Sequence, residues 1–555
     1  ASTSNSIGSF KTLKNNIQFG SGIIGNHFTF DGRISMISSD GYIDRARSDL
    51  KSFYFSTAYL DENNSLRLNV FSGKEKTYQA WNGVAEYLLK TNRTNNPSGT
   101  ERPGEPYDNE TDNYTQTHYQ LFYNHKFNVN WKGNIAAFLT RGKGYYEQYK
   151  AQQSLSDYGL PDYNNGTTVI TETDLVRQLW LDNYFYGTIF SMQYRKNKTQ
   201  LIIGGGYNAY DGKHYGQLKW AAVQAAVPFN HHWYDLTAFK KDLSLYSKWT
   251  QQLNNNWQGF ADIQFRNINY SIHGFRYNPA LEIKKDYSFL NPKLGITYSN
   301  NQWEAYVSYA LAAKEPNRDD FEAGNTQQPK PERLHDLELG FEKKNRTCAF
   351  GANLYYMRYR DQLVLTGKIN DVGAYTRTNI PKSFRAGIEL QGKLSLASWM
   401  NIVANLTFSE NKISNFTEYL DDYDNGGQQT KFYGKTDIAY SPSVVGAGSI
   451  NFIPVKNAEI SLISKYVGRQ YLDNTSQKSR SLNPYYLQDI RMSYTLSKKL
   501  FKETNLVLQL NNVLNKKYEP NGYSFSYIYG GELTTENFYF PMAGFNWMFG
   551  VNLKF

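Results

Sequence analysis

The side chains best suited to ligand chemistry are two neighbouring histidines followed by two aromatic residues, His231, His232, Trp233 and Tyr234. Neutral imidazole is the commonest metal ligand among side chains, so this pair would suit haem iron or a metal chelate. Adjacent histidines in a polar loop are, however, more often only solvated. The group is therefore a candidate ligand-binding site, with an ordinary loop as the alternative interpretation.

Further aromatic residues lie in polar segments, where their rings would stack on a flat or apolar ligand. They are Tyr78, Trp81, Tyr145, Tyr146, Tyr523, Tyr527 and Tyr529. The alternative is that these rings pack within loops or line a membrane boundary, where Tyr and Trp are enriched. Arg318 would attract an anionic ligand, although Asp319 and Asp320 follow it directly and offset its charge.

Other chemical signatures are weak. The acidic stretches 108–112 and 421–426 suggest calcium, but neither has the spacing of an EF-hand loop, and solvated loops are the favoured interpretation. The sequence contains no G-x-S-x-G, no H-E-x-x-H and no phosphate loop. We therefore expect neither an enzyme nor a resident cofactor or metal.

The secondary structure that positions these residues is clearest at the C-terminus. Phe545, Trp547, Phe549, Val551, Leu553 and Phe555 alternate with less apolar residues up to the end of the sequence. A period of two places the aromatic set on one face of a strand. The partners Asn546, Asn552 and Lys554 then occupy the other face, and the aromatic face requires an apolar neighbour, either a second sheet or lipid.

The same pattern recurs along the whole chain as hairpins. Short turns rich in Asn, Asp and Lys join the strands at one end, at 61–64, 195–198, 254–256, 299–302, 343–346, 398–399 and 454–457. The other connections are long and polar, at 75–114, 145–182, 212–239, 314–334, 361–382, 414–438 and 518–541. Gly204, Gly205 and Gly206 fall inside a strand pattern, where they indicate close packing or strand bending.

Composition agrees with a sheet in a membrane. Aromatic residues make up 16% of the 555 residues, with 46 Tyr and 10 Trp. No stretch has the roughly 18 consecutive apolar residues of a membrane-spanning helix, but alternating strands escape averaged hydropathy. The excess of Lys and Arg, +10, is scattered rather than grouped as in a nucleic-acid binder. It indicates polar loops and interior, with attraction to anionic lipid or an anionic ligand as a second possibility.

These features predict an all-β fold: a transmembrane antiparallel β-barrel of about 22 strands, forming a single domain over residues 1–555. An even strand number places both chain ends on the short-turn side. A barrel of this width encloses either an aqueous pore or a plug. A soluble sandwich would explain one alternating strand, but not about ten hairpins with short turns at one end and long loops at the other.

Several segments, in this order, carry a family resemblance. They are residues 8–10, 39–42, 331–332, 338–340, 386–389, 466–471 and 510–518, and the terminal Phe555. On these segments the chain resembles the barrel portion of TonB-dependent outer-membrane receptors, particularly those of the Bacteroidetes. The resemblance covers nearly the whole chain.

The resemblance implies a receptor in the outer membrane of a Gram-negative bacterium that captures a scarce metal chelate at its loops. Ferric siderophores are the favoured substrates, with cobalamin or haem next. The TonB complex would drive import through a plug that precedes the first strand. This sequence begins inside that strand, so we expect the plug to be absent from the chain. Phe555 would form part of the signal read by the barrel-assembly machinery.

Two other functions compete with nutrient import. A passive, porin-like channel would use the loops as its only filter, and a surface barrel would dock a lipoprotein. An upstream plug, channel conductance and a copurifying partner would distinguish the three.

Overall fold

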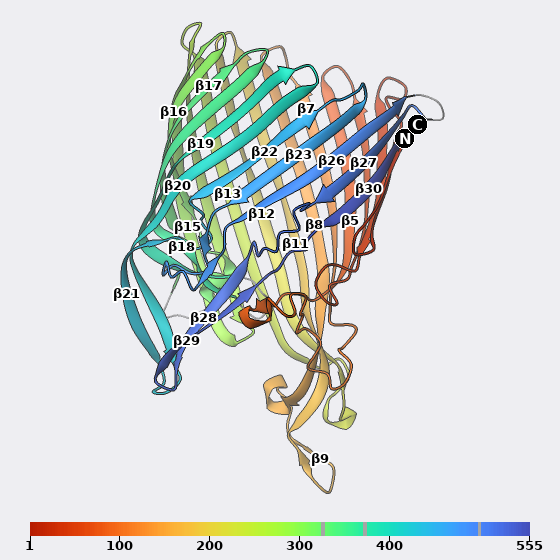
Figure 1. Cartoon of the computed structure of the whole chain (residues 1–555), viewed down its shortest axis with the longest axis vertical. Helices are drawn as coiled ribbons and strands as arrows, with labels where there is room; N and C mark the ends of the chain where they lie inside the picture. Colours follow the sequence, from red (N-terminus) through yellow and green to blue (C-terminus); the bar gives the residue numbers. More distant parts are fainter. Residues whose placement is uncertain (323–327, 370–374, 498–500) are drawn as a thin grey trace.

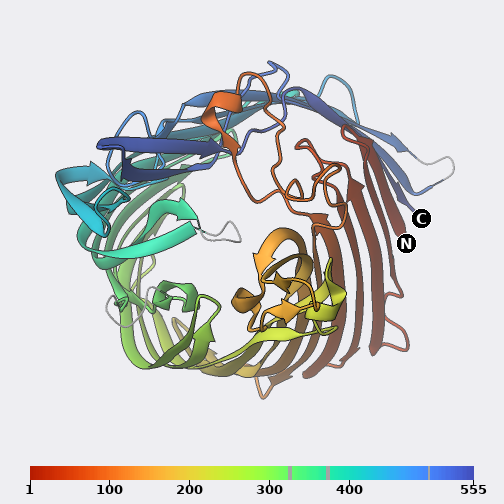
Figure 2. The same cartoon turned by 90° about the horizontal axis from the view of Figure 1, so that it is seen from below.

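The fold is one closed sheet. The computed structural model describes residues 1–322, 328–369, 375–497 and 501–555, and in these residues 22 antiparallel strands form a barrel (Figures 1 and 2). Strand β1 (Ser2–Gly8) pairs with both β2 (Thr12–Gly20) and β30 (Asn546–Lys554). The sheet therefore has no open edge, as a sheet in hydrocarbon requires, and the predicted fold class is confirmed.

The remaining barrel strands follow in chain order. The first half comprises β3 (Phe28–Ser39), β4 (Ser48–Leu60), β5 (Asn64–Tyr78), β7 (Thr111–Lys126), β8 (Trp131–Ser154), β11 (Glu172–Lys196), β12 (Thr199–Ala221), β13 (His232–Gln252), β14 (Trp257–Phe275) and β15 (Asn278–Asn300). The second half comprises β16 (Trp303–Lys314), β17 (Glu332–Lys344), β18 (Cys348–Ile369), β19 (Tyr375–Ala397), β20 (Met400–Asp422), β22 (Val444–Phe452), β23 (Ala458–Val467), β26 (Tyr485–Ser497) and β27 (Glu503–Asn511).

The predicted short turns all join successive barrel strands at the end that holds both termini (Figure 1). Side chains at the first turn position fix their geometry. Asp61 Oδ1 accepts hydrogen bonds from the backbone N–H groups of Asn63 and Asn64, at 2.8 and 2.7 Å. Asn254 and Asn345 cap their turns in the same way. The Asn and Asp residues that marked these turns in the sequence therefore make the expected Asx contacts.

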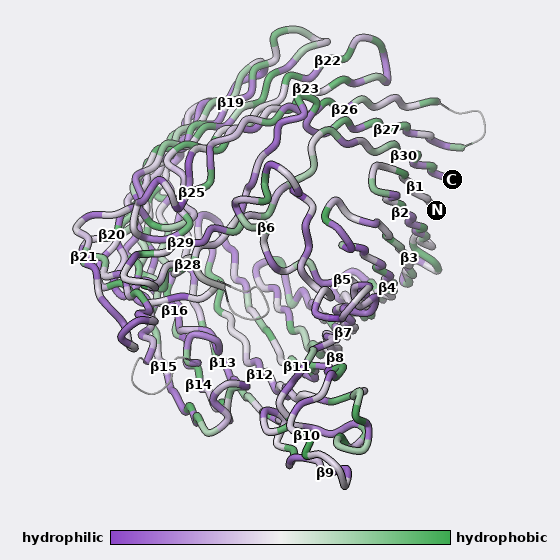
Figure 3. Tube along the Cα trace, turned by 60° about the horizontal axis from the view of Figure 1, so that its bottom comes forward, coloured by the Kyte–Doolittle hydropathy of each residue, from purple (hydrophilic) through white to green (hydrophobic). Residues whose placement is uncertain are grey.

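Apolar side chains point outward along the barrel. Leu339 is 51% exposed and Leu354 47% exposed, values that would be unfavourable in water but suit lipid. Trp547 on β30, and Phe545 directly before this strand, belong to the same outward set, whereas the amide of Asn552 donates to Asn505 on the other face. Figure 3 shows the alternation of hydrophobic and hydrophilic residues along the strands.

Several strands continue well beyond the lipid, which corrects the predicted loops. A spanning strand needs about 9–11 residues, yet β8, β11 and β12 have 24, 25 and 23. The predicted loops 145–182 and 212–239 are therefore largely strand. Both faces of a strand outside the membrane meet water or loops, so polar residues occupy both, and this composition resembles a loop.

The glycine run lies within β12, as predicted. A Cβ on Gly204 would come within 2.7 Å of the backbone oxygen of Phe190, and one on Gly205 within 2.5 Å of that of Ser244. The run therefore permits close packing of β12 against its neighbours.

Outside the barrel ring, two hairpins form a lobe at the loop end (Figure 1): the distal part of β20 with β21 (Gln428–Asp437), and β28 (Gly522–Tyr529) with β29 (Glu532–Tyr539). The hairpins meet in a short parallel pairing between Asp421 and Tyr527. Asp424 accepts hydrogen bonds from the backbone N–H groups of Gly530 and Gly531, at 2.9 and 2.8 Å. This acidic stretch therefore joins two hairpin tips.

Short elements complete the loop end. They are β6 (Val84–Ala85), η1 (Glu86–Leu88), η2 (Leu155–Tyr158), β9 (Tyr163–Asn164), β10 (Val169–Ile170), η3 (Gln224–Ala226), η4 (Arg318–Phe321), β24 (Gln470–Tyr471) and β25 (Ser481–Leu482). Of the helices that the structure describes, none has the length and apolarity needed to cross a membrane. Seen from this end, the segments after β5 and β8 fold inward over the barrel opening (Figure 2).

Candidate functional site

A cavity of about 640 Å³ lies at the loop end of the lumen; we call it the mouth pocket. Its volume is within the usual range for small-molecule sites. The lining comes from β5, β7, β8, β11, β12 and β13, the β14–β15 turn, η4 and the segment after β5. The lining residues are Glu75, Trp81, Asp112, Tyr114, Gly144, Tyr145, Tyr146, Leu179, Trp180, Leu181, His214, Tyr234, Leu236, Arg276, Tyr277, Arg318, Asp319 and Glu322.

One wall of the mouth pocket is aromatic. Trp81 meets Tyr146 edge to face, with ring centroids 5.1 Å apart, and Tyr234 and Tyr277 line the same cavity. Outward residues of β8, such as Ile135, have odd numbers, so strand alternation turns Tyr146 inward. These rings offer stacking faces to a ligand that enters the lumen.

Two arginines supply positive charge. Arg276, in the β14–β15 turn, donates to the hydroxyl of Tyr146 at 3.3 Å and lies over the ring of Tyr277, 4.3 Å from its centroid. Arg318 donates to the backbone oxygen of Gly274 at 3.2 Å and lies over the ring of Phe275. Burial lowers the pKa of the Arg318 guanidinium. Both arginines are thus held in fixed positions at the cavity.

Arg318 is placed by the short helix η4. Asn317 and Asp320 form a capping box at its start, and Phe321 is fully buried among Ile268, Tyr270 and other apolar residues. The arginine therefore belongs to an anchored segment. Of its two acidic neighbours, Asp319 lies 3.7 Å from Arg318, and Asp320 pairs with Arg377 instead.

Acidic residues outnumber the arginines in the mouth pocket. Glu75, Asp112, Asp319 and Glu322 face Arg276 and Arg318, which gives four carboxyl groups against two guanidinium groups. A ligand with many negative charges would be repelled by this surplus. The site therefore favours an aromatic ligand of low net charge with a few anionic oxygens.

Tyr145 borders the same cavity, but its ring belongs to the outer face. It lies opposite Trp180, and Trp180 lies opposite Tyr215. The centroid distances are 4.6 Å between Tyr145 and Trp180 and 5.6 Å between Trp180 and Tyr215, with the second pair stacked. His232 stacks on Tyr215 at 4.9 Å. These four rings form one row on the face opposite Tyr146.

The structure places five predicted site residues around the mouth pocket, Trp81, Tyr145, Tyr146, Tyr234 and Arg318. The histidine pair is not part of its lining. His231 Nε2 lies 2.8 Å from the backbone oxygen of Tyr158, and Trp233 packs on the ring of Tyr158. With His232 in the outer row, the predicted His231–Tyr234 group is divided between different environments.

The remaining predicted residues lie elsewhere. Tyr78 donates to the backbone oxygen of Tyr107 at 2.8 Å, which anchors its loop. On β28, Tyr523 is 4% exposed and stacks on Phe538, and Tyr527 donates to Glu536. Tyr529 is 67% exposed near the hairpin tip. Nine of the candidate residues lie on strands rather than in loops: Tyr78, Tyr145, Tyr146, His232, Trp233, Tyr234, Tyr523, Tyr527 and Tyr529.

Sequence reasoning missed Arg276 and Tyr277. They lie in a tight turn in which Gly274 has a positive φ of 83°, a conformation that favours glycine. The Gly274-Phe275-Arg276-Tyr277-Asn278 stretch was the available signal. Within the described residues, no group of three or more His, Cys, Asp or Glu side chains is arranged to hold a metal ion.

The segment that carries Arg318 is tied to the barrel by Glu315. This residue is 6% exposed, and its carboxylate accepts from Lys240 Nζ at 2.8 Å and from Arg266 Nη1 at 3.2 Å. Burial alone would raise the pKa of Glu315, but the hydrogen bond and charge of Lys240, together with Arg266, lower it below its usual 4.5.

A pH dependence of this segment follows. A carboxyl group whose pKa is lower in the folded state stabilises above its unfolded pKa and loses this effect as pH falls through the folded pKa. We expect the protection of residues 315–321 against hydrogen–deuterium exchange, measured relative to the intrinsic exchange rate at each pH, to fall in that acidic range. In Glu315→Gln, exchange should be faster at neutral pH and less dependent on acid. Equal acid dependence in both proteins would contradict the assignment.

Solved structures with the same fold cover the whole chain. The ferric-catecholate import receptor Fiu from E. coli K12, in its closed form, covers 100% of this chain and 81% of its own at 14% identity, with a TM-score of 0.69. The siderophore receptor PiuA from Acinetobacter baumannii has the same coverages, at 13% identity and with a TM-score of 0.71. The copper transporter OprC covers 100% of this chain and 80% of its own, at 11% identity and with a TM-score of 0.72. At these identities the likeness concerns the fold.

The closed 22-strand sheet, together with the family match given next, makes the chain an outer-membrane barrel of the receptor and transporter class. The family described as "TonB dependent receptor-like, beta-barrel" matches residues 48–513. This match covers most of the chain, and the protein belongs to that family. No curated protein matches the chain in sequence.

Proposed function

We propose that the protein imports a metal chelate across the outer membrane, with a ferric siderophore as the favoured substrate and cobalamin or haem next. The chain acts as a single barrel domain over residues 1–555, and transport is driven by the TonB complex through a plug domain. The observation that carries the proposal is the mouth pocket, an aromatic cavity with two fixed arginines at the loop end of the lumen.

The chemistry of the mouth pocket favours an aromatic chelate. Trp81, Tyr146 and Tyr277 offer ring faces and edges to planar groups. The guanidinium groups of Arg276 and Arg318 match the anionic oxygens that hold a metal. The four carboxyl groups of the pocket disfavour a highly charged chelate, so a ferric complex with partly neutralised catecholate or phenolate groups fits best.

Two tyrosines on the neighbouring strands β7 and β8, one outward and one luminal, provide a matched test. Tyr146→Ala removes a ring from the mouth pocket, and we expect it to weaken binding of a ferric catecholate by about tenfold, since an aromatic contact and its burial contribute about 1–2 kcal/mol. Tyr119→Ala on β7 removes an exposed ring from the outer face, outside the pocket lining, and should bind as the parent does. Equal losses in both variants would contradict a role for the mouth pocket.

A growth experiment tests the transport function itself. A strain that carries the complete gene should grow on a single ferric siderophore as its iron source, and a deletion strain should not. Growth of both strains on every tested iron, haem and cobalamin source would reject nutrient import. Steady conductance of the complete protein in planar bilayers would favour a passive channel, and a stoichiometric copurifying lipoprotein would favour a docking barrel.

The terminal aromatic residue has a separate proposed role. Phe555 is 50% exposed, meets the ring of Phe501 at 5.1 Å, and donates its backbone N–H to the oxygen of Ala1 at 2.9 Å. It thus marks the seam between the first and last strands. We propose that the barrel-assembly machinery recognises Phe555, in which case Phe555→Ser should slow membrane insertion while a mature barrel stays stable.

A further inference from the structure

The outer face of three neighbouring strands carries a compact group of basic side chains. They are Arg333 and His335 on β17, Arg358 and Arg360 on β18, and Lys382 on β19, and all five are exposed. We call this group the basic patch. It lies toward the loop end of the barrel, on the face opposite the lumen.

Cross-strand pairing brings these charges side by side. Arg333 lies opposite Arg360, which in turn lies opposite Lys382. One step nearer the lipid, His335 lies opposite Arg358. Like charges directly opposite in a sheet are destabilising. The arrangement therefore costs the fold stability unless an external anion compensates it.

The protein supplies little compensation of its own. Arg360 Nε lies 3.6 Å from Asp361, and His335 shares a hydrogen bond of 2.7 Å with the hydroxyl of Tyr309. No carboxylate in the described part of the chain forms an ion pair with Arg333, Arg358 or Lys382.

The charges adjoining the patch on β20 and β21 are already paired. Glu410 lies 2.8 Å from Lys435, and Lys412 lies 2.7 Å from Asp437. These pairs on β20 and β21 therefore add no unpaired positive charge to the patch.

The basic patch lies at the edge of the hydrocarbon region. On the short-turn side of the patch, the same outer face carries apolar residues. Leu337, Leu354 and Tyr356 are 48%, 47% and 49% exposed there. On β18 Arg358 lies ten positions beyond Cys348, which is beside the short turn. Ten strand residues tilted by about 40° cross about 25 Å, the height of the apolar band of such barrels.

We propose that the basic patch binds the phosphate groups of an anionic lipid in the outer leaflet. The planar guanidinium groups of Arg333, Arg358 and Arg360 match phosphate oxygens in a two-point geometry, and Lys382 adds a point charge. The acyl chains of the same lipid lie along Leu337, Leu354 and Tyr356. A soluble anion would lack this apolar half of the site.

This lipid site is separate from the mouth pocket. Residues that alternate with the patch, such as Glu338 and Asn353, line a luminal cavity, whereas the patch residues point to the surroundings of the barrel. The inference therefore goes beyond nutrient import and does not depend on it.

The test compares lipid binding by the parent chain and by the triple variant Arg358→Gln, Arg360→Gln, Lys382→Gln in phosphatidylcholine nanodiscs. The probe is diphosphorylated lipid A, with binding followed by native mass spectrometry. Basic residues near a membrane surface contribute about fivefold each, so the triple variant should bind about 100-fold more weakly. Lipid A that lacks its phosphate groups should bind the parent chain as weakly as diphosphorylated lipid A binds the triple variant.

A luminal triple variant is the matched control. Lys14→Gln, Arg33→Gln and Arg67→Gln remove the same charge from residues that alternate with the outward Leu13, Ile34 and Leu68, and lipid binding should be unchanged. Heat-modifiable gel migration checks that each variant forms a barrel. Unchanged lipid A binding by the outer variant, an equal loss in the luminal variant, or no preference for phosphorylated lipid A would overturn the proposal.

Discussion

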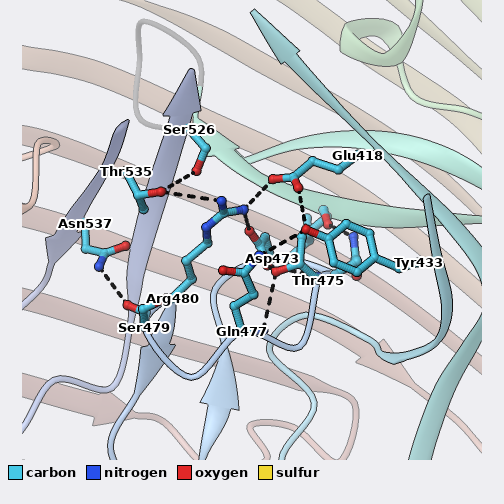
Figure 4. Close-up of polar contacts among 12 residues, drawn as sticks. Glu418, Tyr433, Asp473, Thr475, Gln477, Ser479, Arg480, Ser526, Thr535 and Asn537 are labelled. Atoms are coloured by element: carbon cyan, nitrogen blue, oxygen red, sulfur yellow. Dashed lines mark hydrogen bonds and ion pairs between the residues drawn. The ribbon is translucent and has the colours of Figure 1, made fainter. Parts of the chain in front are cut away.

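Replacing Arg480 by alanine is expected to release the extracellular lobe from the barrel mouth. Arg480 is 1% exposed and lies between β24 and β25. Its Nη1 donates to Glu418 on β20 and, at 2.9 Å, to Asp473 (Figure 4). Without the guanidinium group, two carboxylates remain in a buried environment, which costs about 3–5 kcal/mol in comparable cases.

The surrounding contacts make this effect local. The second oxygen of Glu418 accepts from the hydroxyl of Tyr433 on β21 at 2.8 Å, and Arg480 Nη2 points toward Thr535 on β29 (Figure 4). Asn537, on the same strand, donates to the backbone oxygen of Ser479 at 2.8 Å. One side chain therefore joins both hairpins of the lobe to the loop between β24 and β25.

Hydrogen–deuterium exchange is the appropriate measurement. In Arg480→Ala, β21, β28 and β29 should exchange faster, while the barrel strands β1 to β5 keep their protection. The triple variant Arg480→Met, Glu418→Gln, Asp473→Asn removes the stranded charges and should recover much of the protection. Unchanged exchange of the lobe in Arg480→Ala would refute this role.

An arginine on the lipid face should have an effect of similar size on the barrel itself. Leu354 is 47% exposed near the middle of the apolar band on β18. A charge at this depth costs about 2–4 kcal/mol, so Leu354→Arg should lower the free energy of unfolding from lipid vesicles by that amount. Urea titration followed by tryptophan fluorescence measures the change.

Two controls separate the effect of the added charge on stability from the effect of the lost apolar contact. Gln391 lies on β19 opposite Gly351, and alternation places it toward the lumen. Gln391→Arg should therefore change stability by much less than Leu354→Arg. Leu354→Ala removes the apolar contact without adding charge and should fall between them. Equal destabilisation by both arginines would mean that the face assignments are wrong.

The sequence contains enough information for the barrel architecture. Turn residues such as Asp61, Asn254 and Asn345 define one end of the hairpins, because their side chains cap the turn backbone locally. The outward set follows from the period of two and from lipid, which tolerates only apolar side chains on one face. Strand number and the position of both termini follow from these local rules.

The site depends on information that local rules lack. Tyr145 and Tyr146 are equivalent in sequence. Only the alternation along β8, counted from its lipid-facing residues toward the loop end, assigns one ring to the outer face and the other to the lumen. Arg276 and Tyr146 are 130 residues apart and meet because of the cross-strand register of the whole barrel. The aromatic character of the mouth pocket was therefore predictable from the sequence. Which residues line the pocket could be known only from the register of the closed sheet.

The seam between β1 and β30 has a consequence for the surrounding membrane. Its ladder contains seven residue pairs, and backbone hydrogen bonds of Phe555 and Ser9 extend it by one pair at each end, so that the seam spans about 30 Å along the strand and about 23 Å along the membrane normal at a tilt of 40°. An unperturbed bilayer has a hydrocarbon core of about 30 Å. The resulting hydrophobic mismatch should thin the bilayer locally beside the seam, and acyl chains there should be shorter or more disordered than around the taller strands.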